Sequence, residues 1–281
     1  MAELRIENVS YVYSEGTPYE INALKNINVT IKSGSVTGII GHTGSGKSTL
    51  VQMLNGLVKP AGGRILLDGN DIWEKSSEIG QIRFKVGLVM QYPEYQLFEE
   101  TIRADIAFGP KNMGLDSDEI EKRVLEAADF VGLDRDMLDK SPFDLSGGQK
   151  RRAAIAGVIA MCPEILVLDE PAAGLDPLGR ETIMRGIMNY KKSSGATIVI
   201  VSHSMEDMAR YCDELIVLSD GELLMQGTQK EVFSRADELV AVGLDIPQIT
   251  TVMKLLKEKG IPVGTAVYTV DDALAEIYKL L

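Results

Sequence analysis

The chain has 281 residues, of which 45% are hydrophobic and 25% charged, an ordinary composition for a globular protein of one large or two modest domains. Its formal net charge of −12 excludes the basic surface of a nucleic-acid-binding protein, so we expect no nucleic-acid partner. No apolar run approaches the roughly 20 residues of a membrane span. We therefore expect a chain that reaches a membrane only by docking on a partner. Cys162 and Cys212 are too far apart for a metal-ligand pair, and both are expected to be small buried thiols.

The first segments are predicted to be strands. Residues 4–13 and 24–32 alternate in part and carry Ile, Val, Tyr and Thr, with a turn at 14–18 between them. A further short strand is predicted at 64–69. Tyr13 falls near the end of the first strand, where its ring can either stack on a purine base or pack across the strand.

A glycine-rich loop follows an apolar strand-like run at 36–40 and precedes a helical pattern from Leu50. That order of strand, glycine turn and helix is what a phosphate-binding loop requires. Its backbone N–H groups can converge on phosphate oxygens at the positive end of a helix dipole, while Lys47 reaches the phosphates and Ser48 ligates Mg²⁺. The loop residues are Gly41, His42, Thr43, Gly44, Ser45, Gly46, Lys47, Ser48 and Thr49.

A buried strand is predicted at 85–90, and it leads to Gln91 and an aromatic segment, 91–98. The pattern then becomes helical, so residues 92–144 are predicted to be a helical insertion. One helix is expected to begin at Asp116, with Glu119 completing a capping box, and to end at Gly132. Tyr92, Tyr95, Leu97 and Phe98 are interpreted either as an exposed coupling surface or as part of the core of the insertion.

Two further segments place polar groups beside predicted elements. Ser146, Gly147, Gly148 and Gln149 precede a helical pattern at 150–161; Ser146 is a plausible N-cap, and this second helix start is also a potential anion site. The apolar run 165–168 predicts a buried parallel strand that ends in Asp169 and Glu170. Carboxylates at that edge of a sheet suit a Mg²⁺ ligand and a base that polarises water.

The remaining chain contains one more buried strand and a helical end. The strand at 197–201 leads to His203, and a hairpin is predicted around 219–221. After about residue 230, apolar stripes at helical spacing favour short helices that pack locally or form a dimer surface. We expect a domain at 1–234 and a C-terminal helical extension at 235–281.

Together these segments closely resemble the nucleotide-binding subunit of ATP-binding cassette (ABC) proteins over residues 3–230. The resemblance implies an α/β fold: a P-loop NTPase core with an N-terminal antiparallel β subdomain, a helical subdomain and a small C-terminal extension. It also implies ATP and Mg²⁺ as cofactors, with Ser48, Gln91 and Asp169 around the metal. The implied roles are Tyr13 for base stacking, 41–49 as Walker A loop, Gln91 as Q-loop glutamine, Ser146–Gln149 within the signature sequence, Glu170 as catalytic glutamate, Asp176 in the D-loop and His203 as switch histidine.

The family pattern further implies two ATPase subunits arranged head to tail, each signature sequence closing over the other subunit's ATP. The segment 91–98 and the stretch Asp245-Ile246-Pro247-Gln248 narrow the resemblance to the ATPases of energy-coupling factor (ECF) transporters, which import vitamins and transition-metal ions. The amino-acid sequence of the phosphate loop resembles that of the second of their two paralogous ATPases. Implied partners are a paralogous or identical ATPase, a transmembrane coupling subunit and a substrate-binding membrane subunit. The implied location is the cytoplasmic side of the cell membrane, as a peripheral protein.

The alternative is a soluble ABC ATPase of a non-transport assembly, in DNA repair or iron–sulfur biogenesis. DNA-repair types require long heptad arms, and this chain has only a modest helical insertion. The segment 91–98 argues against the iron–sulfur type. The transported substrate does not follow from this sequence, because substrate capture in the family belongs to another subunit.

Overall fold

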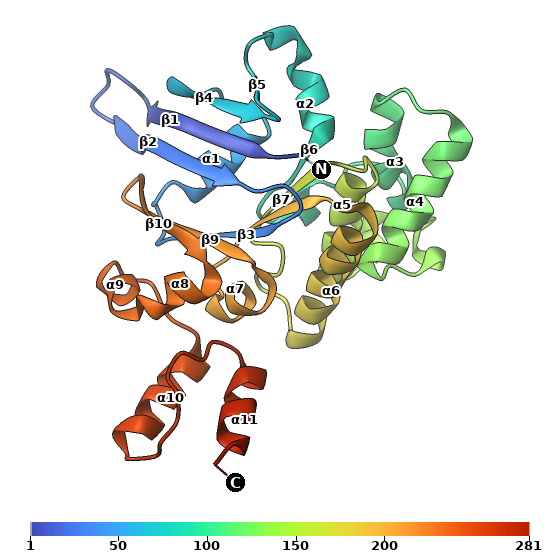
Figure 1. Cartoon of the computed structure of the whole chain (residues 1–281). Coiled ribbons are helices and arrows are strands. Elements are labelled where there is room, and N and C mark those ends of the chain that lie inside the picture. Colours follow the sequence, from blue (N-terminus) through green and yellow to red (C-terminus); the bar gives the residue numbers. More distant parts are fainter. Residues whose placement is uncertain (1, 281) are drawn as a thin grey trace.

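Two β-sheets of different connectivity form the framework of the chain, whose computed structural model describes residues 2–280 (Figure 1). The first sheet is antiparallel, with strand order β2-β1-β4-β5. Its strands are β1 (Leu4–Tyr13), β2 (Ile21–Ile31), β4 (Gly62–Leu67) and β5 (Asn70–Asp71). This sheet confirms the strands predicted at the N-terminus.

The second sheet has six strands in the order β10-β9-β3-β8-β7-β6, all parallel except the hairpin strand β10. Its strands are β3 (Val36–Ile40), β6 (Val86–Val89), β7 (Ile165–Asp169), β8 (Thr197–Val201), β9 (Glu214–Ser219) and β10 (Glu222–Thr228). The three strands β3, β7 and β8 are buried at every position, which explains their continuous apolar sequences.

The parallel sheet separates two hydrophobic cores. Along β7, Leu166 and Leu168 belong to the core shared with the larger helices, whereas Ile165 and Val167 belong to the core shared with the antiparallel sheet. This alternation follows from the two-residue period of a strand. The helix α1 (Lys47–Leu54) contributes to the second core, so it packs between the two sheets.

Except for α2, whose Ile82 packs against the same core as α1, the other helices cover the opposite face of the parallel sheet or extend from it (Figure 1). Three of them, α3 (Ile102–Asn112), α4 (Ser117–Val131) and α5 (Gly147–Ile159), pack against one another. The remainder are α2 (Ile79–Lys85), α6 (Pro177–Ser194), α7 (Met205–Tyr211), α8 (Gln229–Ser234), α9 (Ala236–Ala241), α10 (Gln248–Glu258) and α11 (Val270–Tyr278). The fold is therefore the predicted α/β P-loop NTPase core with an antiparallel sheet, a helical region and a C-terminal helical segment.

The predicted helix after Asp116 is confirmed, but its capping box is not. The Asp116 side chain accepts the backbone N–H of Glu119 at 2.9 Å, and Gly132 ends the helix in the left-handed region. The Glu119 carboxylate instead accepts the Arg123 guanidinium at 2.7 Å. A charged partner one turn ahead competes successfully with the neutral backbone N–H that a capping box would use.

The two cysteines differ in their burial, and the C-terminal helices have a core of their own. Cys212 is buried as predicted, but the expectation of a buried Cys162 is wrong: this residue is exposed, in a left-handed turn just after α5. At the C-terminal end, Met253, Val263, Val267 and Ala273 form a small core of their own. Figure 1 shows α10 and α11 projecting from the rest of the molecule.

Candidate functional site

Four neighbouring strands deliver the predicted site residues to one edge of the parallel sheet. The phosphate-loop sequence follows β3, His203 follows β8 closely, Asp169 and Glu170 stand at the end of β7, and Gln91 follows β6. Because these strands are adjacent and parallel, their carboxyl ends meet. A cleft of about 390 Å³ opens there, lined by Tyr13, Ile21, Ala23, Thr43, Gly44, Gly46, Lys47, Ser48, Thr49, Gln91, Asp169, Glu170 and His203.

The loop before α1 has a backbone that only glycine tolerates at one critical position. Gly46 has φ +99°, and a Cβ atom there would lie 2.5 Å from the carbonyl oxygen of Ala23. Gly46 is also the N-cap of α1 and offers no side chain to the first-turn N–H groups. The helix start therefore presents free backbone donors toward the cleft, which is the requirement for anion binding.

Lys47 is the cation of the cleft. Its Nζ donates to the carbonyl oxygens of Gly41 at 2.6 Å and His42 at 3.0 Å, which holds the side chain across the loop. The side chain is buried, and burial lowers the pKa of Lys47, although the nearby carboxylates of Glu170 and Asp169 oppose this shift. A phosphate is the partner that such a desolvated ammonium lacks.

Asp169 and Glu170 form a buried carboxylate pair opposite this lysine. Burial raises the pKa of Asp169, against the Ser48 hydroxyl and the Lys47 ammonium. Burial and the adjacent Asp169 charge raise the pKa of Glu170 to about 7. The Glu170 backbone is held at φ +53° while its N–H donates to the carbonyl of Val201 at 3.0 Å.

The carboxylate of Glu170 keeps one oxygen free for a ligand. Among the residues that the structure describes, its buried Oε1 has no hydrogen-bond partner. His203 Nε2 lies 3.5 Å from that oxygen, and burial and the charge of Lys47 lower the pKa of His203. A carboxylate with a pKa near 7, an oxygen without a hydrogen-bond partner and a neighbouring imidazole suits the activation of a water molecule.

The donor set also fits a magnesium ion held together with phosphate. Ser48, Asp169 and Gln91 line the cleft together, and each offers an oxygen ligand. Within residues 2–280, no three acidic, histidine or cysteine side chains are clustered as a metal cage. Mg²⁺ does not require such a cage, because it keeps waters and phosphate oxygens in its coordination shell.

Tyr13 stands at the rim of the cleft with its ring 39% exposed. Its hydroxyl lies 3.2 Å from Thr49 Oγ1, and its ring packs edge-on against Tyr11. Ile21 and Ala23 line the same rim, which the sequence analysis did not predict. In the structure, Ile21 reaches the rim because it pairs with Tyr13 across the hairpin.

Three residues of the predicted loop, Gly41, His42 and Ser45, do not line the cleft. Ser45 is fully buried, and Gly41 packs closely against it. His42 faces the β9–β10 turn, where its Nδ1 lies 2.8 Å from the carbonyl oxygen of Thr43 and its Nε2 accepts the Asp220 N–H at 3.3 Å. The His42 ring therefore ties the phosphate loop to the hairpin.

The segment 146–149 lies outside this cleft, at the start of α5. The Ser146 hydroxyl accepts the Gln149 N–H at 3.4 Å, and the Gln149 amide oxygen accepts the Ser146 N–H at 2.8 Å. The N-cap predicted at Ser146 is therefore confirmed as a full capping box. Ser146 and Gly147 are exposed, so this helix start faces solvent.

Asp176 also lies outside the cleft, where it caps α6 by accepting the Gly179 N–H at 2.7 Å. A buried arginine connects these parts. Arg151 on α5 is 4% exposed and donates to both oxygens of Glu94, at 2.9 and 2.6 Å, and to the carbonyl oxygen of Ala173. It links α5 to the segment after Gln91 and to the loop after Glu170.

Comparisons with known proteins agree with this geometry. The sequence model of the ABC transporter family matches residues 24–173. The ATP-binding protein EcfA2 of an energy-coupling factor transporter from Caldanaerobacter subterraneus subsp. tengcongensis is 51% identical over 278 residues, which cover 99% of this chain and 97% of that protein. The chain belongs to this family of ECF transporter ATP-binding proteins.

Two solved structures show the same fold. CbiO1 from Clostridium perfringens, described as part of the ABC transporter complex CbiONQ, is 43% identical with a TM-score of 0.76, over 89% of this chain and 98% of that one. The ATP-binding cassette MJ0796, in a dimeric post-hydrolysis state with ADP and Pi, is 32% identical with a TM-score of 0.72, over 80% and 98%. Among residues 2–280 of the ECF ATPase described here, no helix is long and apolar enough to cross a membrane.

Proposed function

We propose that this chain is the ATP-hydrolysing subunit of an ECF importer of vitamins or transition-metal ions, a translocase that works as a peripheral protein on the cytoplasmic side of the cell membrane. The observation that carries the proposal is the arrangement of Glu170. Its buried carboxylate has an oxygen without a hydrogen-bond partner and a raised pKa, and Glu170 lines the cleft together with Lys47. Membership of the ECF ATPase family supports the transport role.

Each side chain of the cleft then has a defined task. The N–H groups at the start of α1 and the Lys47 ammonium bind the phosphates, and the Tyr13 ring covers the base. Glu170 Oε1 accepts a hydrogen bond from the attacking water and takes its proton, while His203 orients the group being transferred. Mg²⁺, when bound at Ser48, Gln91 and Asp169, supplies charge neutralisation of the phosphate oxygens.

Replacing Glu170 with glutamine tests the hydrolytic role. Glu170→Gln keeps the volume and removes the base, so ATP turnover is expected to fall about a hundredfold or more while ATP still binds. The measurements are phosphate release at saturating ATP and titration with a fluorescent ATP analogue. Turnover near that of the unaltered protein would contradict the role of Glu170.

The partners in this proposal are another ATPase subunit, identical or paralogous, and two membrane subunits. Head-to-tail pairing would bring the exposed N–H groups at Gly147 and Gly148 to the nucleotide of the other subunit. ATP would favour the closed pair, and hydrolysis would remove the contacts that distinguish closed from open. The dimeric structure of the related cassette MJ0796 supports the pairing of two ATPase subunits.

The membrane partner is proposed to dock beside the segment after Gln91. Tyr95 is 84% exposed and Phe98 65% exposed, so the alternative that both are buried in the helical insertion is wrong. A groove of about 290 Å³ lies next to them, lined by apolar residues of α3 and α5 together with Leu97, Phe98 and Phe108. Exposed aromatic anchors beside an apolar groove suit a helix of a membrane subunit.

A double substitution separates docking from catalysis. Tyr95→Ala with Phe98→Ala is expected to leave ATP turnover of the isolated ATPase unchanged but to abolish substrate uptake by the reconstituted complex. Tyr19→Ala removes an equally exposed ring on the β1–β2 turn and serves as the control. Normal uptake by the double variant would place the docking surface elsewhere.

The C-terminal extension, 235–281, is proposed to stabilise pairing with the other ATPase. Its helices expose apolar side chains, among them Val252, Leu255, Leu274 and Tyr278, and none of these lines the nucleotide cleft. A chain ending at Ser234 should dimerise less strongly while keeping its nucleotide affinity. Sedimentation velocity with ATP measures this, and an unchanged dimer fraction would assign those side chains to local packing.

A further inference from the structure

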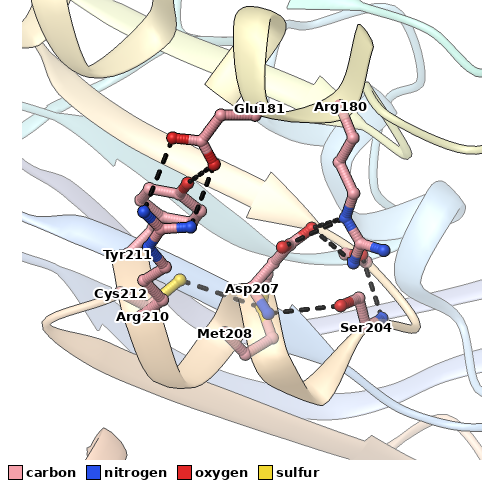
Figure 2. A network of polar contacts seen from close by, with 9 residues as sticks. Arg180, Glu181, Ser204, Asp207, Met208, Arg210, Tyr211 and Cys212 are labelled. Atoms are coloured by element: carbon pink, nitrogen blue, oxygen red, sulfur yellow. Dashed lines mark hydrogen bonds and ion pairs between the residues drawn. The ribbon is translucent and has the colours of Figure 1, made fainter. Parts of the chain in front are cut away.

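The helices α6 and α7 both begin beside the cleft, and a polar network joins them (Figure 2). α6 begins directly after Asp176, the proposed D-loop aspartate. α7 begins two residues after His203, with Ser204 as its N-cap. Their relative position therefore determines how the two loops that flank the cleft lie toward each other.

The contact nearest the site is an ion pair between Arg180 and Asp207. Arg180 Nε lies 3.2 and 2.9 Å from the two oxygens of Asp207, and a terminal guanidinium nitrogen lies 2.8 Å from Oδ2. Asp207 is 9% exposed. A buried carboxylate held by a planar guanidinium fork resists rotation, because displacement would leave the carboxylate unpaired.

Hydrogen bonds continue from Asp207 to both neighbours of His203. The Asp207 N–H donates to Ser204 Oγ at 3.2 Å, and the Ser204 N–H donates to Ser202 Oγ at 3.1 Å. The backbone around His203 is thus fixed on both sides by a chain that starts at Arg180. Only the imidazole, whose side chain is 55% exposed, is left free to meet Glu170.

A second ion pair across the same two helices provides an internal comparison. Arg210 donates to Glu181 at 2.9 Å, and Tyr211 also donates to this carboxylate. Both charged side chains are exposed, at 59% and 41%, and the pair lies at the end of α7 away from Ser204 (Figure 2). Exposed pairs of this kind contribute little to stability.

We propose that Arg180 is a positioning residue for ATP hydrolysis, which acts through Asp207 to hold the His203 turn against Glu170 and the start of α6. This rests on the proposed hydrolysis at the cleft. Within residues 2–280, the hydrogen bonds and ion pairs of Arg180 and Asp207 reach neither the phosphate loop nor Tyr13, so we expect the pair to affect the rate of the chemical step and not the binding of ATP.

The test compares full-length variants by turnover at saturating ATP, KM, affinity for a fluorescent ATP analogue, and melting temperature. Arg180→Ala is expected to lower kcat about tenfold, because a displacement of the order of 1 Å at a reacting group has effects of this size or larger. KM and analogue affinity should stay within about twofold of the unaltered values. Arg180→Lys, which keeps the charge but not the fork, should recover part of the rate.

Two further variants test whether a loss of kcat is specific to the Arg180–Asp207 pair. Arg210→Ala, the control on the same helix pair, should keep kcat within about twofold. Arg180→Ala combined with Asp207→Asn leaves no buried unpaired charge and should be no slower than Arg180→Ala alone, as expected for residues acting through one contact.

The results distinguish this inference from the proposed function. A folded Arg180→Ala or double variant with unchanged kcat, or an equal loss in Arg210→Ala, overturns the inference while hydrolysis by the unaltered protein stands. If the unaltered protein is no faster than Glu170→Gln, the proposed hydrolysis fails and the inference fails with it.

Discussion

The starts of α1 and α5 are both glycine-rich, yet they satisfy their backbone donors in opposite ways. At α1, Gly46 gives no side-chain cap, so the first N–H groups face the cleft beside Lys47. At α5, Ser146 and Gln149 cap each other's backbone, and the helix start lies outside the nucleotide cleft. The first N–H groups of α1 therefore lack hydrogen-bond acceptors until an anion binds. The start of α5 has its own side-chain cap, and it still presents N–H groups to a ligand from outside the chain. We conclude that a glycine-rich sequence does not by itself define a complete anion site; the presence or absence of a cap decides.

The largest expected effect comes from removing the cation at the first helix. Lys47→Ala should weaken binding of a fluorescent ATP analogue by about 10- to 100-fold, since a charge-assisted phosphate contact of about 1.5–3 kcal/mol is lost. Lys150→Ala removes the cation in the first turn of α5 and is the matched control, expected to leave the chain's own ATP affinity unchanged. Equal losses in both variants would mean that the two helix starts do not differ as described.

The second prediction concerns the start of α5. Ser146→Arg places a long cation where the N-cap hydroxyl faces solvent, and it should empty the ATP site of the partner subunit while sparing the chain's own cleft. The experiment uses a dimer altered on one side only, with nucleotide occupancy measured at each site. Ser141→Arg, which adds the same charge a short way upstream, is the control. Loss confined to the altered subunit's own cleft would contradict head-to-tail pairing.

A further expected effect is a pH dependence of stability that arises at the carboxylates facing α1. The pKa of Glu170 is raised from 4.5 to about 7 on folding, so the folded state holds the proton more tightly than the unfolded one. The stabilisation is complete below pH 4.5 and is lost as pH rises toward 7, at most about 3 kcal/mol for this residue. Urea unfolding at pH 5 and pH 8, without Mg²⁺ or nucleotide, should show this loss.

The isosteric variant isolates the contribution of Glu170. Glu170→Gln should lose less stability than the unaltered protein between the two pH values, with a remainder from Asp169, whose pKa is also raised. Identical losses in both proteins would show that Glu170 has an ordinary pKa.

The local sequence predicted what depends on short-range patterns. The buried strands, the phosphate loop, the caps at Asp116 and Ser146 and the carboxylates after β7 each follow from a few neighbouring residues. Long-range pairing was not predictable in this way. Arg151 meets Glu94 across 57 positions, and Arg180 meets Asp207 across 27, so both partners appear in the sequence only as charged residues on helices or loops.

The three errors of the sequence-based predictions have different physical causes. The Glu119 carboxylate had both a backbone donor and Arg123 within reach, and the sequence does not rank them. Cys162 is exposed because the turn after α5 directs it away from the core. The sequence does not indicate this turn, because the residue with a positive φ is the cysteine itself and not a glycine. Ile21 was not assigned to the cleft because the register of the first hairpin contains shifts that a sequence pattern does not reveal.

The buried Arg151 has a mechanical consequence. Its guanidinium holds Glu94, beside the proposed membrane-facing groove, and the carbonyl oxygen of Ala173, in the loop that begins at Glu170. Burial alone would raise the pKa of Glu94, but the hydrogen bonds and charge of Arg151 lower it overall, so the contact stays ionic. The segment beside the groove, α5 and the loop that begins at Glu170 are therefore joined directly through one side chain, and we expect a displacement of the groove to be transmitted to that loop through Arg151.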